Sequence, residues 1–126
     1  VIRMKLSTNG GKTWGPSLRT DLPCSGMVHF SATLLLSGQV AIVFHNTWHS
    51  SAKSPISIAI SNDFLGKTFP YVRDLEIADQ GKLGGTQRGH KDTNINGFDF
   101  PTLVQTPNGL IHVAYATKHY VKARKQ

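Results

Sequence analysis

The sequence predicts an all-β fold, and three observations lead to that prediction. Short segments alternate apolar and polar residues, as in residues 1–6, 39–45 and 55–61, which is the pattern of half-buried strands. Clusters of glycine, proline and asparagine separate these segments and indicate turns. No stretch sustains a helical periodicity. The length of 126 residues suits a single domain.

The first predicted element is a half-buried strand over residues 1–6, because every second residue in it is apolar. A turn over residues 7–14 follows. We expect the indole of Trp14 to anchor this turn against a core, since a buried aromatic side chain supplies a large apolar surface. Residues 21–26 contain proline and glycine and are predicted as a loop.

Hairpins and single strands make up the rest of the prediction. Residues 78–97 interrupt them with a long, polar, glycine-rich segment, and a loop of that size in a compact domain is functional or disordered. The predicted elements are a hairpin with strands 27–36 and 39–45, strands at 55–61 and 71–77, a second hairpin with strands 98–105 and 110–116, and a last strand at 119–125.

A turn of unusual composition occurs twice. Residues 7–14 read STNGGKTW and residues 61–69 read SNDFLGKTF, so both contain Ser, an acid or amide, Gly-Lys-Thr and an aromatic residue. Such a recurrence predicts a repeat architecture. The residues expected to shape the turns are Ser7, Asn9, Gly11, Thr13 and Trp14 in the first copy, and Ser61, Asp63, Gly66, Thr68 and Phe69 in the second.

Both turns resemble the Asp-box, the Ser-x-Asp-x-Gly-x-Thr-Trp motif of BNR repeats in sialidase-like β-propellers. The first copy has Asn9 where the family usually has Asp, and the second ends in Phe69. Residues 100–115, FPTLVQTPNGLIHVAY, resemble the Tyr-Pro segment near the C-terminus of BNR-repeat sialidases. The resemblance covers nearly the whole chain and matches the C-terminal portion of such a protein.

The resemblance implies four-stranded antiparallel blades with Asp-box turns. At about 50 residues per blade, the chain would form a single partial β-propeller domain with two to two and a half blades of a six-bladed ring. The expected parts are a blade end at 1–22, a complete blade at 27–77, a loop at 78–97 and a partial last blade at 98–126. Rings have about four to eight blades. Either N-terminal blades are missing, or copies self-associate, most simply as a trimer.

The resemblance also implies the chemistry of an exo-α-sialidase, a glycoside hydrolase. Such enzymes use a Tyr nucleophile activated by a Glu, an Arg cluster for the substrate carboxylate and an acid/base Asp. This chain has Phe100 where the Tyr-Pro segment has Tyr, and Lys53 where the family often has Arg. The chain by itself is therefore expected to lack a complete catalytic site, and whether it is an enzyme stays open.

A few polar and aromatic side chains are candidates for a site. Asp99, at a strand start, and Glu76 are candidates for a catalytic carboxylate, although Glu76 also fits an ordinary surface position on a strand. Lys53 and Arg88 are candidates for binding an anionic substrate, with a solvated surface charge as the alternative. Trp48 either stacks on a sugar ring or packs under its own loop.

Structural roles are expected for several histidines and tyrosines. His112 lies in an apolar strand and is expected to be a hydrogen-bonded core histidine. Tyr115 and Tyr120 are expected to be core or interblade aromatics. The spacing of His29, His45 and His49 matches no zinc pattern, so no metal site is predicted, and no cofactor motif is found.

The formal net charge is +7 and the isoelectric point about 9.9. This suits anionic partners such as sialylated glycans or nucleic acid, or else a solvated basic surface. The single cysteine, Cys24, excludes an intramolecular disulfide. No apolar run reaches membrane-spanning length. Residues 1–6 lack the features of a signal peptide, and the sequence assigns no compartment.

Three functional hypotheses remain open. The first is a sialidase-like segment that takes part in the hydrolysis or binding of sialylated or other glycans. The second is a non-catalytic structural or glycan-binding unit that completes its ring by oligomerisation. The third is a basic nucleic-acid-binding module, which rests only on the basic residues 119–125.

Overall fold

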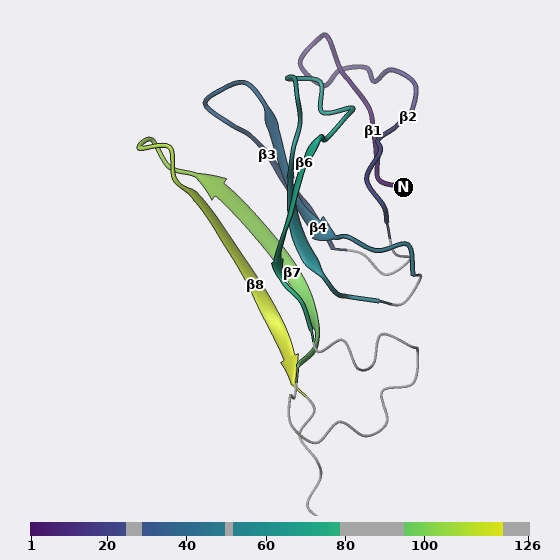
Figure 1. Ribbon diagram of the computed structural model, residues 1–126. Coiled ribbons are helices and arrows are strands. Elements are labelled where there is room, and N and C mark those ends of the chain that lie inside the picture. The colour runs from purple at the N-terminus through teal and green to yellow at the C-terminus, as the bar shows by residue number, and fades with distance from the viewer. Residues whose placement is uncertain (25–28, 50–51, 79–94, 120–126) are drawn as a thin grey trace, which may run out of the picture.

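The computed structural model describes residues 1–24, 29–49, 52–78 and 95–119. These residues form strands in three antiparallel sheets (Figure 1). None of the residues described belongs to a helix, and this part of the chain therefore offers no helix that could cross a membrane. The prediction of an all-β fold is confirmed.

The N-terminal sheet is short. Strand β1 (Arg3–Met4) pairs antiparallel with β2 (Leu18–Arg19). Main-chain hydrogen bonds continue the pairing beyond the strands, from the amide of Ile2 to the carbonyl of Leu22 at 3.1 Å and from the amide of Thr20 to the carbonyl of Ile2 at 3.1 Å. The first Asp-box-like turn lies between these two strands.

The central sheet has four strands in sequence order. They are β3 (Ser31–Leu34), β4 (Val40–His45), β5 (Ile56–Ile60) and β6 (Tyr71–Glu76). Strands β4 and β5 are largely buried, whereas almost every residue of β6 is exposed. Strand β6 is therefore the outer edge of this sheet, and the second Asp-box-like turn precedes it.

The C-terminal sheet is a long hairpin of β7 (Ile95–Gln105) and β8 (Ile111–His119). Strand β7 begins at Ile95 and not at Phe98, so the predicted loop is shorter than expected at its C-terminal end. His119 ends β8 and does not start a separate last strand, because no turn-forming residue interrupts the strand after Ala116. Residues 120–126 lie outside the described part of the chain.

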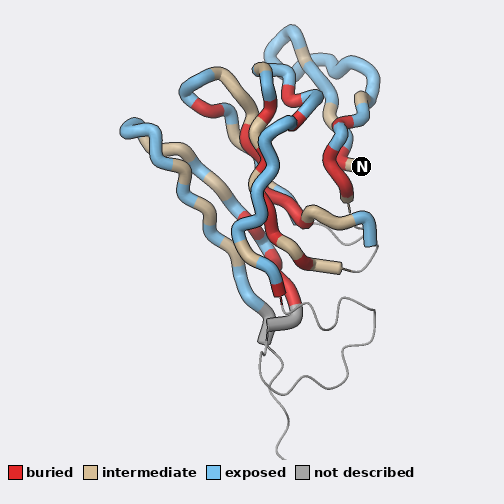
Figure 2. Tube along the Cα trace, viewed as in Figure 1, coloured by how far each residue is buried: buried red, intermediate tan, exposed pale blue. Residues whose placement is uncertain are grey.

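The central sheet lies between the other two sheets, because its side chains alternate between two cores. Neighbouring residues of β4 point to opposite faces, as in any strand. Figure 2 shows the buried residues running through the middle of the molecule, with exposed residues on β6 and on the turns. One core contains Ile2, Leu22, Ile42, Phe44, Ala59 and Phe69, and the other contains Val43, Ile56, Ala78 and Phe98.

Candidate functional site

The first Asp-box-like turn is held by its own side chains. Ser7 Oγ accepts the amide of Gly11 at 2.8 Å, and Asn9 Oδ1 accepts the amide of Thr13 at 2.9 Å. Asn9 Nδ2 also donates to Thr13 Oγ1 at 2.8 Å. A carboxylate at this position could only accept. Asn9 therefore replaces the acidic residue of the motif without loss of the turn.

Trp14 does not anchor this turn in a core. Its side chain is 60% exposed, and its ring lies over Gly11, with Cζ2 3.8 Å from where a glycine Cβ would stand. The expectation that the indole is buried is wrong for the single chain, because the two-stranded N-terminal sheet places none of the described residues over it.

The second turn is joined to the core. Asp63 Oδ1 accepts the amides of Leu65 at 2.9 Å and Gly66 at 3.1 Å. Phe69 is buried in the core shared with the N-terminal sheet, and its amide donates to the carboxylate of Asp21 at 3.1 Å. This turn therefore connects the central sheet to the segment that follows β2.

Two further residues of the second turn complete its hydrogen bonding. Ser61 Oγ accepts the amide of Val40 at 2.8 Å, which ties the turn to the start of β4. Thr68 Oγ1 donates to Asn62 Oδ1 at 2.8 Å. Both Asp-box-like turns are thus structural elements at one end of the sheets (Figure 1).

A buried ion pair lies at the opposite end of the sheets. Lys53 Nζ, in the loop between β4 and β5, is 2.5 Å from Asp99 Oδ1 on β7. The side chain of Asp99 is only 2% exposed, so the ammonium group compensates a carboxylate that has lost most of its water. The carbonyl of Lys53 also accepts the amide of Phe98 at 3.1 Å. Both bonds dock the loop onto the start of β7 (Figure 1).

Gly97 allows this close approach. A Cβ at Gly97 would lie 2.8 Å from Lys53 Cβ, which is closer than real carbon atoms pack. A residue without a side chain is therefore needed where the loop passes over β7. A glycine inside a strand indicates a bulge or a close approach of another backbone, and Gly97 within residues 95–100 (INGFDF) is the sequence signal for this contact.

Phe100 projects from a β-bulge beside the ion pair. The register of β7 against β8 shifts between Asp99 and Thr102, and Phe100 has φ of 51°. A bulge redirects a side chain, and a non-glycine residue with positive φ is a strained feature that is common at functional sites. The Phe100 ring is 65% exposed and its centroid lies 4.6 Å from that of His29.

His45 lies beneath this surface and is fully buried. Its Nε2 donates to the carbonyl of Phe98 at 2.9 Å, since a carbonyl oxygen can only accept. Nδ1 is then a buried acceptor without a hydrogen-bond partner among the described residues. Burial lowers the pKa of His45, although the Phe98 carbonyl and the charge of Asp99 oppose this shift.

A second polar contact joins two sheets. The hydroxyl of Tyr115 on β8 donates to Glu76 Oε2 at the end of β6, at 2.6 Å. This bond, together with burial, raises the pKa of Tyr115 to about 12. The ring of Tyr115 packs edge-on against Phe98, with centroids 5.5 Å apart. Glu76 therefore lies between two sheets, where it holds a neutral phenol.

The other predicted residues have different surroundings. Trp48 is 66% exposed, so the alternative that it packs under its loop is wrong. His112 is exposed and is not a core histidine, because its neighbour Val113 takes the face of β8 that packs on the core. Arg88 and Tyr120 lie outside the described residues.

The described residues bring together no metal site. No group of three or more His, Cys, Asp or Glu side chains among them could hold an ion. What this end of the sheets does bring together is the ion pair of Lys53 and Asp99, the buried His45 and the exposed ring of Phe100. An ion pair beside exposed rings can hold a polar ligand that has apolar faces.

Comparison with known families gives one match. A family model described as a BNR repeat-like domain matches residues 1–113. The match spans both Asp-box-like turns and the residues at the opposite end of the sheets, in agreement with the resemblance noted from the sequence. No curated protein and no solved structure matches the chain significantly.

Proposed function

Because the chain belongs to the family of BNR repeat-like domains, we propose that its sheets are β-propeller blades and that the end opposite the Asp-box turns binds a glycan. The observation that carries this proposal is the exposed, strained Phe100 next to the buried pair of Lys53 and Asp99. A protein rarely holds an apolar ring in solvent at a strained position without a use for it.

The chemistry of these groups fits a sugar. An aromatic ring covers the C–H face of a pyranose, while polar groups around it bind hydroxyls. The ammonium group of Lys53 has three donors, of which one points to Asp99. The others can reach a hydroxyl or carboxylate of the ligand. Trp48, exposed in the same loop as Lys53, adds a second ring surface.

The described residues favour binding over hydrolysis. Phe100 has no hydroxyl to act as a nucleophile, and Asp99 is engaged by Lys53. The nearby phenol, Tyr115, has a pKa raised to about 12 by its bond to Glu76, which opposes formation of a phenolate nucleophile. We therefore propose a glycan-binding part of a propeller whose own residues do not complete a sialidase site.

Isothermal titration of the chain with sialyllactose and with lactose tests this function. We expect Phe100→Ala to weaken binding by about tenfold, the size of one lost ring contact. Phe64→Ala is the matched control, since Phe64 is 72% exposed but lies in the second Asp-box turn. Equal affinity of both variants, or no binding of either sugar, would overturn the proposal.

A fluorogenic sialoside separates binding from catalysis. We expect no turnover by the chain at any pH where it is folded. Turnover that Phe100→Ala leaves unchanged and Tyr115→Phe abolishes would show that the phenol is a nucleophile after all. In that case the hydrolytic alternative would replace the binding function.

A further inference from the structure

The N-terminal sheet corresponds to the second half of the central sheet. Strands β1 and β2 enclose the first Asp-box-like turn, as β5 and β6 enclose the second. Aligning the turns at Ser7 and Ser61 places Ile2 at the position of Ile56. Both of these side chains are buried against the sheet that follows along the chain. The correspondence therefore extends from the turns to the packing.

The C-terminal hairpin corresponds to the first half of the central sheet. The β3–β4 and β7–β8 turns have the same length and the same two main-chain hydrogen bonds. In this alignment Phe44 matches Tyr115, and both side chains face the preceding sheet. The shared main-chain hydrogen bonds of the β3–β4 turn run from the amide of Leu35 to the carbonyl of Gln39 at 2.8 Å and from the amide of Gly38 to the carbonyl of Leu35 at 2.9 Å. In the β7–β8 turn they run from the amide of Thr106 to the carbonyl of Leu110 and from the amide of Gly109 to the carbonyl of Thr106, both at 2.9 Å.

These two halves cannot pair within one chain. The N-terminal sheet packs on one face of the central sheet and the C-terminal hairpin packs on the other. Strand β8 pairs with β7 on one side, and no strand among the described residues pairs with its other edge. A strand edge that pairs with none of the described strands is a template for another strand.

We propose that β8 pairs with β1 of a second copy of this chain, so that the two halves form a composite four-stranded sheet. The central sheet supplies the register, because Val43 lies opposite Ile58. The corresponding residues are Ala114 and Met4, and we expect these to lie opposite each other across the two copies. The strand order then repeats that of the central sheet.

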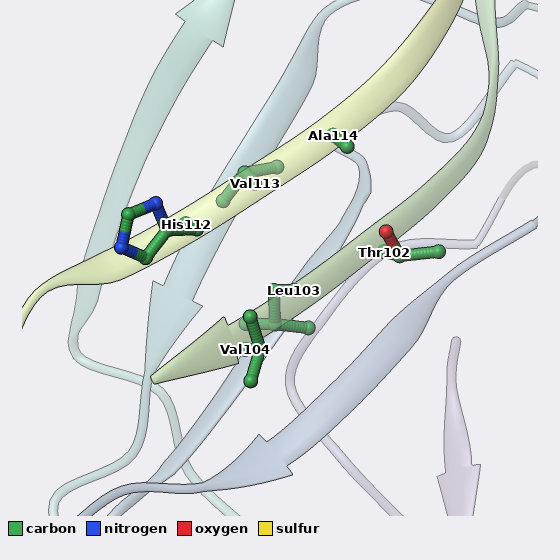
Figure 3. Close-up of a pocket in the computed structure, with 6 residues that line it drawn as sticks. All are labelled: Thr102, Leu103, Val104, His112, Val113 and Ala114. Atoms are coloured by element: carbon green, nitrogen blue, oxygen red, sulfur yellow. The ribbon is translucent and has the colours of Figure 1, made fainter. Parts of the chain in front are cut away.

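The exposed face of the C-terminal hairpin supports this arrangement. This face carries the exposed residues Thr102, Val104, His112 and Ala114. They line a groove of about 480 Å³ on the hairpin (Figure 3), whose lining also includes Leu103 and Val113 from the side that packs on the core. In the composite sheet this face would meet the central sheet of the second copy, on the side where Leu34 points. Val104 is 55% and Leu34 64% exposed in the single chain. Both would be covered by the contact.

The exposed side chain of Trp14 is a second observation that supports the pairing of two copies. It ends the first turn as Phe69 ends the second, and Phe69 is buried against the preceding sheet. The single chain has no preceding sheet among its described residues, which leaves Trp14 60% exposed. In the composite arrangement the central sheet of the other copy takes that place and covers the indole, removing a large apolar surface from water.

The charges at the contact are complementary at one position. The register places Arg3 of the second copy opposite Tyr115, whose hydroxyl is bonded to Glu76. A guanidinium group there would approach the Glu76 carboxylate. The surface of β8 and the surface of β1 are different, so the contact is head-to-tail, and such contacts form a ring when the rotation between copies closes. Each copy contributes two sheets, and we propose three copies because the resemblance of the sequence implies a ring of six, within the range known for propellers.

Light scattering on a size-exclusion column is the first test. We expect a mass of about three times the 13.8 kDa of one chain. Trp14→Ser should shift the mass to that of one chain, and Trp48→Ser should not. The two indoles are about equally exposed in the single chain, at 60% and 66%, so neither variant should unfold it. A single-chain mass for the unmodified protein at every concentration would overturn the proposal.

Disulfide cross-linking tests the register. Met4→Cys and Ala114→Cys are made separately in a Cys24→Ser background and then mixed under oxidising conditions. We expect a linked pair of chains from this mixture. A mixture of Phe64→Cys and Ala114→Cys should give none, since Phe64 lies at the tip of the second turn. Equal cross-linking in both mixtures would show contacts without this register and would overturn the proposed pairing.

Discussion

The ammonium group of Lys53 and the carboxylate of Asp99 form an ion pair at 2.5 Å, although the residues are 46 positions apart. The pair fixes the β4–β5 loop to the start of β7, and the exposed ring of Phe100 follows directly after it. The position of the proposed ligand surface therefore depends on this contact between two sheets.

Removing the cation should destabilise the fold. Lys53→Met removes the ammonium group that pairs with the carboxylate of Asp99, whose side chain is only 2% exposed, and we expect a loss of about 2–4 kcal/mol in the free energy of unfolding. Urea denaturation measures this loss. Lys67→Met, at an exposed position of the second turn, is the control and should change stability by less than about 0.5 kcal/mol. A loss as small as that for Lys53→Met would show that the pair contributes little.

A methyl group at Gly97 should displace the loop. Gly97→Ala would place Cβ 2.8 Å from Lys53 Cβ at a backbone φ of 157°, so we expect a loss of about 1–3 kcal/mol in stability from the overpacked contact and the strained backbone together. Glycan affinity should fall in parallel, because Lys53 moves. Gly15→Ala is the matched control, where the nearest atom would be an ordinary 3.4 Å away. Unchanged stability and affinity of Gly97→Ala would contradict the proposed docking of the loop.

Stability should fall at mildly acid pH because of His45. Its pKa in the folded chain is lowered by burial, whereas in the unfolded chain it is about 6.5. The unfolded chain therefore binds the proton more readily, and stability present above about pH 6.5 is lost as the pH falls below that value. Burial is the largest cause of the lowered pKa of His45, and the charges of Lys53 and His29 act in the same direction, whereas the hydrogen bond to the Phe98 carbonyl and the charge of Asp99 oppose it.

Urea unfolding at a series of pH values measures this effect. His45→Gln should flatten the dependence between about pH 7 and 5. His112→Gln, at an exposed position, is the reference for what a change from histidine to glutamine does to stability at neutral pH. An equal slope in the His45→Gln variant and the unmodified chain would assign the dependence to other groups.

Tyr115 should add stability that is lost at high pH. Its pKa is raised to about 12 by the bond to Glu76, above the usual value of about 10. The contribution is complete below about pH 10 and disappears as the pH rises toward 12. Tyr115→Phe should lower stability by roughly 1 kcal/mol at neutral pH and remove an ionisation at about pH 12 from an absorbance titration. Tyr71→Phe, at an exposed position, is the control and should keep that ionisation of Tyr115.

Local patterns in the sequence predicted both turns and the strands other than β2 (Leu18–Arg19). The alternation in residues 39–45 predicted a half-buried strand, whereas β4 is buried on both faces because it packs against two cores. The side chains of Asn9 and Asp63 form their turns through contacts within a few residues. Such contacts depend on nearby residues only, so they can be inferred from one sequence. The family followed from the same motifs and is shown by the match over residues 1–113.

The candidate site could not be predicted in the same way. Lys53 lies in the β4–β5 loop and Asp99 lies on β7, far apart in the sequence. The positive φ of Phe100 results from a β-bulge, which the residue types at these positions do not predict. The indole of Trp14 is expected in a core because of its large apolar surface, but it is 60% exposed in the structure. Its exposure depends on which sheets are present, which local sequence does not encode.

The most direct test of the glycan site is a ¹⁵N chemical-shift titration of the chain with sialyllactose. We predict that the shifted amides cluster around Lys53, Trp48 and Phe100, at the end of the sheets opposite the Asp-box turns. Shifts centred on the turn residues Asn9 and Asp63 instead, or no shifts at saturating sugar, would contradict the account.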